Sequence, residues 1–150
     1  MKELKEIIGK FSAGEFTLEA ANRALANVGA GFHLACCAAD RILVVSGADP
    51  AALRDAASVS ALLADRPRGT VRLIVNRIVP KLFRRMNTTV DDLMDSVGLP
   101  LMGIVPEDES VTLAAAMGIP LISYTGKKAS RACLNIARRL RGRIVPLSRI

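Results

Sequence analysis

Two short apolar runs in the middle of the chain stop abruptly at polar residues. The first spans residues 71–76 and the second residues 101–105, with a polar, helix-compatible segment between them. This pattern predicts two buried parallel strands joined by a helical crossover, a right-handed βαβ unit. In such sheets, ligands bind beyond the carboxyl ends of the strands. The residues that the pattern places at this edge are Asn76, Arg77, Pro106, Glu107 and Asp108.

The alternation of strands and helices extends from residue 41 onward. Further strands are predicted at 41–46 and 120–123, and helices at 51–64, 90–97, 111–117 and 127–141. Residues 78–86 are interpreted as a connecting segment. The expected N-caps are Asp49, Thr88 or Thr89, and Asp108 or Ser110. The pattern is typical of an α/β protein, a three-layer sandwich with a mostly parallel sheet.

Residues 1–30 follow a different, purely helical pattern. Apolar residues recur at helical spacing before residue 12, and Thr17 can cap a second helix that ends near Gly29. We therefore expect a helical hairpin over residues 1–30 and an α/β domain over residues 31–150. The hairpin is expected to pack on the main sheet or to mediate oligomerisation.

The chain has 150 residues and a net charge of +7, carried mainly by arginine. A basic balance favours anionic partners, although a solvated arginine-rich face explains it equally well. The three cysteines and the single histidine, His33, lack the spacing of a zinc site. No apolar run approaches the ~20 residues of a membrane span. These features predict a cytoplasmic protein, with peripheral contact at the inner membrane left open.

Four segments of the chain, in order, resemble the C-terminal half of the MinD/ParA family of deviant Walker P-loop ATPases. Residues 39–45 are similar to the strand that follows the Walker B region, and residues 49–56 to the helix start "PExxxxRDA". Residues 74–77 resemble the "VNR" strand end. Residues 99–108, Leu-Pro-Leu-Met-Gly-Ile-Val-Pro-Glu-Asp, match "LPLLGVIPED" nearly residue for residue. The resemblance implies a partial P-loop NTPase, Rossmann-like fold.

The resemblance also implies a function and a site. Family members bind ATP or ADP and act in placing the cell-division site or in partitioning, and their Asn-Arg and Pro-Glu-Asp loops surround adenine. Asn76, Arg77, Pro106 and Glu107 are then candidate contacts to the base. An Asn side chain can pair with a purine edge and an Arg can stack on its face. Without the resemblance, these residues would be interpreted simply as strand ends and turns.

The chain departs from the family pattern at the phosphate and metal sites. Nothing in it fits the phosphate loop G-x-x-x-x-G-K-[ST]. If residues 27–31 correspond to the family's "DxPAG" segment, the magnesium-linked Asp is replaced by Asn27, which cannot supply its charge. Magnesium binding is therefore unlikely, and we expect a truncated or degenerate relative that does not hydrolyse ATP alone.

An alternative function is a non-catalytic basic scaffold. Exposed arginines could bind a protein partner, a membrane surface or DNA non-specifically; the candidates are Arg84, Arg85, Arg138, Arg139 and Arg141. Arg54 and Asp55 are candidate dimer or partner contacts, because they open the family's partner-facing helix, although an ordinary exposed pair is about as plausible. Loss of the central phosphate-loop strand should also expose a sheet edge, which the hairpin or self-association would cover. We do not expect an enzyme of another class, because the sequence contains no suitable catalytic constellation.

Overall fold

The computed structural model describes residues 30–67 and 69–147, so the expected hairpin lies outside the described residues. The chain divides into two compact units, residues 1–42 and 43–150. The first unit contains the helix α3 (Ala30–Ala38). No helix of the described part is long and apolar enough to cross a membrane.

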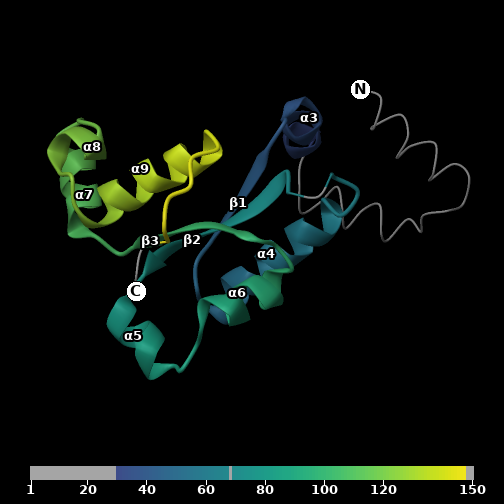
Figure 1. Cartoon of the computed structure of the whole chain (residues 1–150), viewed down its shortest axis with the longest axis horizontal. Coiled ribbons are helices and arrows are strands. Elements are labelled where there is room, and N and C mark those ends of the chain that lie inside the picture. The colour runs from purple at the N-terminus through teal and green to yellow at the C-terminus, as the bar shows by residue number, and fades with distance from the viewer. Residues whose placement is uncertain (1–29, 68, 148–150) are drawn as a thin grey trace, which may run out of the picture. The chain divides into compact units, whose positions relative to one another are not determined.

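A three-stranded sheet in the order β1-β2-β3 runs through the α/β part of the chain, with helices on both faces (Figure 1). Its strands are β1 (Ile42–Ser46), β2 (Val71–Ile78) and β3 (Leu101–Pro106), and β2 pairs in parallel with β3. The helices are α4 (Pro50–Leu62), α5 (Pro80–Arg85), α6 (Val90–Val97), α7 (Glu109–Ala116), α8 (Leu121–Tyr124) and α9 (Lys128–Leu140). The expected α/β layering is confirmed.

Local capping chemistry fixes where the helices begin. The Asp49 side chain accepts a hydrogen bond from the backbone N–H of Ala52, and Pro50 occupies the first turn of α4. Thr89 and Asp92 form a reciprocal capping box at α6, and Gly98 ends that helix in the left-handed conformation. Of the two alternatives for each cap, the structure selects Thr89 over Thr88 and Asp108 over Ser110.

Three sequence expectations were wrong in detail. The segment 78–86 contains the helix α5, which Pro80 initiates. The strand expected at 120–123 is the short helix α8, where the backbone N–H groups of Ser123 and Tyr124 donate to the Pro120 carbonyl. A four-residue apolar run has too little periodicity to separate strand from helix. Strand β2 also continues past residue 76 to Ile78, through a register irregularity.

Strand β3 and helix α9 pack closely against each other in the core. Ile74, Met102 and Ile136 form a buried cluster on this face of the sheet. A Cβ added at Gly103 would lie within 2.8 Å of Ile136 Cδ1 and 3.2 Å of Arg139 Nη1. Arg139 uses this approach to donate a 2.7 Å hydrogen bond to the Met102 carbonyl. It also donates to the carbonyls of residues 145 and 146, which fastens the following tail.

Substitution of Gly103 by Ala should destabilise the fold by about 1–3 kcal/mol, because the new methyl group overpacks the β3–α9 contact. Urea unfolding followed by circular dichroism measures the loss. Gly126→Ala is the matched control, since no atom lies within 4 Å of the added methyl group. Equal stability of the two variants would contradict this packing.

Asp108 ties the start of α7 to the start of α9. The carboxylate is 7% exposed, and it accepts hydrogen bonds from the backbone N–H groups of Ser110 at 3.0 Å and Ala129 at 3.1 Å. Burial alone would raise its pKa. The two backbone donors and the nearby Lys128 charge outweigh burial, so the pKa of Asp108 lies below its usual value. The ionised form therefore stabilises the folded state.

Replacing Asp108 by Asn should cost about 1–3 kcal/mol at neutral pH, because the amide loses the charge that both backbone donors face. The lowered folded-state pKa means that the wild-type advantage is complete above the unfolded-state pKa, near 4. The advantage should disappear as the pH falls through the folded-state pKa. Thermal unfolding between pH 7 and pH 2 tests this, with the exposed Asp95→Asn as control. A pH-independent difference would refute the assignment.

Candidate functional site

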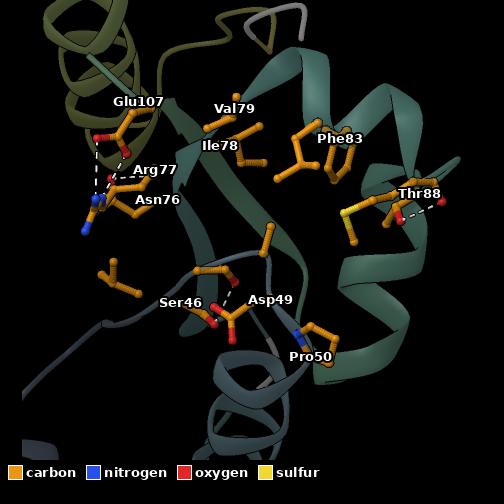
Figure 2. Close-up of a pocket in the computed structure, with 15 residues that line it drawn as sticks. Ser46, Asp49, Pro50, Asn76, Arg77, Ile78, Val79, Phe83, Thr88 and Glu107 are labelled. Carbon is orange, nitrogen blue, oxygen red and sulfur yellow. Dashed lines mark hydrogen bonds and ion pairs between the residues drawn. The ribbon is translucent and has the colours of Figure 1, made fainter. Parts of the chain in front are cut away.

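A cavity of about 640 Å³ lies at the carboxyl ends of β1 and β2, where the βαβ pattern places a site. One wall of the cavity, where α5 meets the ends of the strands, is apolar, and Figure 2 shows Phe83 on this wall. Polar groups occupy the remaining rim: Ser46, Asp49, Asn76, Arg77, Thr88 and Glu107. An apolar wall with a few convergent polar groups suits a small organic ligand.

Arg77 and Glu107 form an ion pair on one rim of this cavity (Figure 2). Arg77 Nε lies 2.8 Å from Glu107 Oε2, and Nη2 lies 3.5 Å from Oε1. The Glu107 carboxylate raises the pKa of Arg77 by hydrogen bonding and by its charge. Both side chains are exposed, so the pair contributes little to stability, but it orients the guanidinium plane at the cavity mouth.

The backbone at the end of β2 produces this arrangement. Arg77 has φ of 59°, in the left-handed region that non-glycine residues rarely adopt. The Asn76 side chain accepts a 3.0 Å hydrogen bond from the Arg77 N–H and so supports the turn. Across the sheet, the Glu107 N–H donates to the Ile78 carbonyl at 2.8 Å. The two loops are therefore linked by main chain as well as by side chains.

The structure brings together three of the four candidate base contacts. Asn76, Arg77 and Glu107 line the cavity, whereas Pro106 pairs with Ile78 at the end of β3 and is absent from the cavity lining. Arg54 and Asp55 lie elsewhere, on exposed positions of α4. Neither of these two residues lines the cavity.

Sequence reasoning missed two parts of the cavity. One is the apolar wall from α5, since residues 78–86 were interpreted as a connection; Pro80 in front of an apolar-basic run was the available signal. The other is the end of β1, where Ser46 and Asp49 lie on the rim. Asp49 was identified only as a helix cap. The same carboxylate can accept hydrogen bonds from a ligand in the cavity.

The cavity suits the base of a nucleotide better than its phosphates. Its volume and apolar wall suit a heterocyclic base, and Asn76 offers both a donor and an acceptor. The lining carries two carboxylates, Asp49 and Glu107, and one guanidinium that is already paired. This balance does not favour several phosphate charges. The described residues also contain no cluster of three or more His, Cys, Asp or Glu that could hold a metal ion.

Two curated relatives match most of the chain. It is 34% identical over 123 residues to the septum site-determining protein MinD of Synechocystis sp., and 35% identical over 124 residues to MinD of Bacillus subtilis. Each match covers 81% of this chain and 46% of the relative. These matches confirm the resemblance to the MinD/ParA family. The chain spans about half the length of the MinD proteins that it matches, and no family model matches it.

Solved MinD structures support the same fold. The MinD cell division protein of Aquifex aeolicus superposes with a TM-score of 0.73 at 32% identity, over 80% of this chain and 51% of that chain. A MinC:MinD complex from the same organism gives 0.74 at 31% identity, over 82% and 51%. MinD of Pyrococcus horikoshii, solved with Mg-ADP, shares the fold at 21% identity with a TM-score of 0.55 over 67% and 41%. The expectation that magnesium is unlikely gains no support here, because that structure contains magnesium.

Proposed function

We propose that this chain is a MinD-like protein of the septum-site or partitioning type that binds the base of ATP or ADP. The cavity at the ends of β1 and β2 supports the proposal, because Asn76, Arg77 and Glu107 meet there beside an apolar wall. Pro106 would contribute by shaping the loop that carries Glu107. In this proposal the chain alone does not hydrolyse ATP, since the sequence has no phosphate loop.

The single observation that carries the proposal is the convergence of residues 30 positions apart, Arg77 and Glu107, on one cavity rim. The ion pair with Glu107 holds the planar Arg77 guanidinium at the mouth of the cavity. A base lying between this surface and the apolar wall would gain stacking on one side and apolar contact on the other. In this proposal, Asn76 selects among bases through its amide.

Titration calorimetry with ATP and with ADP, each with and without magnesium, tests this binding. We expect both nucleotides to bind with similar affinity, because the base rather than the phosphates makes the contacts. Asn76→Ala should raise the Kd about tenfold through loss of the amide hydrogen bonds. Asn135→Ala, in α9 and outside the cavity, is the control.

The outcomes separate the two functions considered. No heat at millimolar nucleotide would remove the base site and favour the alternative, a non-catalytic basic scaffold. Binding that is unchanged in Asn76→Ala would place the nucleotide elsewhere on the chain. Phosphate release from ATP by the purified chain would contradict the proposed lack of hydrolysis.

We also propose that Arg54 and Asp55 contact a second copy or a protein partner. MinD of Aquifex aeolicus assembles with MinC, so relatives of this chain have protein partners. Both residues occupy exposed positions on α4, where charge substitution leaves the core intact.

Reversing one charge, Arg54→Glu, should weaken self-association roughly tenfold or more, since the charge that pairs with it across an interface becomes mismatched. Sedimentation velocity over a concentration series measures the effect. The control reverses one exposed charge on another helix, Arg85→Glu. Self-association that persists unchanged in the α4 variant, or is lost equally in the control, would exclude this surface.

A further inference from the structure

The cavity contains one carboxylate that the proposed base contacts leave unused. Asp49, just beyond the end of β1, is exposed and lines the cavity with Asn76, Arg77 and Glu107. Because the strand order is β1-β2-β3, the end of β2 lies between the ends of β1 and β3. Figure 2 shows Asp49 beside Ser46, apart from the ion pair of Arg77 and Glu107. A ligand whose base lies at the ends of β2 and β3 can therefore extend its next group toward Asp49.

The start of α4 fixes the position of this carboxylate. Asp49 Oδ1 accepts a 3.0 Å hydrogen bond from the Ala52 N–H, and the Asp49 carbonyl accepts one from the Leu53 N–H at 3.0 Å. Within residues 30–67 and 69–147, no donor pairs with the other carboxylate oxygen, Oδ2. A Cβ added at Gly47 would lie 2.9 Å from Oδ2, so this glycine makes room for it. One oxygen thus holds the helix start, and the other is available to a ligand.

The side chains at the end of β1 offer acceptors to the cavity. Ser46 is buried, and its hydroxyl donates to the Gly47 carbonyl at 3.0 Å. With its proton engaged in this way, Ser46 can only accept a hydrogen bond from a ligand. A carboxylate such as that of Asp49 also only accepts. The ligand group at this end of the cavity must therefore carry hydrogen-bond donors and no negative charge.

We propose that Asp49 Oδ2 accepts hydrogen bonds from the sugar hydroxyls of the bound nucleotide, so that the cavity recognises a ribonucleoside. This inference rests on the proposed function, because it takes the base to lie at Asn76 and Arg77. A ribose is joined directly to the base, carries two neighbouring hydroxyl donors and has no charge. The cavity volume of about 640 Å³ leaves room for the sugar beside the base. A phosphate fits this position less well, because its charge would repel the carboxylate.

Titration calorimetry of the full chain with ADP, 2′-deoxy-ADP and 3′-deoxy-ADP tests the sugar contact. These deoxy nucleotides alter the sugar alone, so they separate a hydroxyl donor from an amino group of the base. We expect ADP to bind roughly tenfold more tightly than at least one of the two, because a hydrogen bond to a charged group is lost. This difference in affinity is the ribose preference of the chain.

The variant Asp49→Ser removes Oδ2 but keeps the helix cap, since the single serine oxygen can accept from the Ala52 N–H. Its affinity for ADP should fall about tenfold and its affinity for the disfavoured deoxy nucleotide by less than about twofold, so that the ribose preference disappears. Asp95→Ser, exposed in α6 and outside the cavity lining, should keep the preference. Partial unfolding of a variant lowers both apparent affinities by the same factor, so it leaves their ratio unchanged.

The outcomes distinguish failure of the sugar contact from failure of the base site. Equal affinity of wild type for all three nucleotides, with binding that still depends on Asn76, would overturn the sugar contact alone. A ribose preference that survives in Asp49→Ser would also overturn it. Binding of none of the three nucleotides would overturn the base site together with the sugar contact. Asn76→Ala should weaken binding of ADP and of the deoxy nucleotides alike and keep their ratio, because it removes a contact to the base.

Discussion

The pairing of the ends of β2 and β3 is the constraint on which the candidate site depends. Ile78 lies opposite Pro106, and the Ile78 carbonyl accepts a hydrogen bond from the Glu107 N–H. Parallel pairing means that both strands release their chains at the same edge. Arg77 and Glu107, far apart in sequence, are therefore held within reach of one another before any ligand is present. A change of register by one residue would turn one of these side chains to the opposite face.

The elements predicted best from sequence were those with strong local signals. The run of β-branched residues in β2 and the caps Asp49 and Thr89 identified strands and helix starts close to their positions in the structure. The prediction was wrong for two short segments, α5 and α8, because four to six residues carry too little periodicity. The conformation of such segments depends on how the chain returns to the sheet. Their helices are set by a proline and by tertiary context.

The same distinction applies to the cavity. Asn76, Arg77 and Glu107 could be predicted from the sequence, because polar residues at the ends of buried strands must lie at the carboxyl edge of the sheet. The left-handed backbone conformation of Arg77 could not be predicted, since arginine has no local preference for φ above zero. The apolar wall from α5 could not be predicted either, because a residue such as Phe83 lines a cavity only once its helix has packed. Pro106 had the right sequence position, but it does not line the cavity, whereas its pairing partner Ile78 does.

Charge is distributed unevenly between the cavity and the C-terminal part of the chain. The cavity rim has Asp49 and Glu107 against a single guanidinium, so it favours a neutral or weakly polar group. The segment beyond residue 109 holds the whole net positive charge, and there α7 and α8 leave apolar side chains in water. A phosphate-rich ligand cannot gain from the cavity what it gains from those cations, and a base cannot gain from the cations what the cavity wall offers. The cavity is therefore expected to recognise the base of a nucleotide rather than its phosphates.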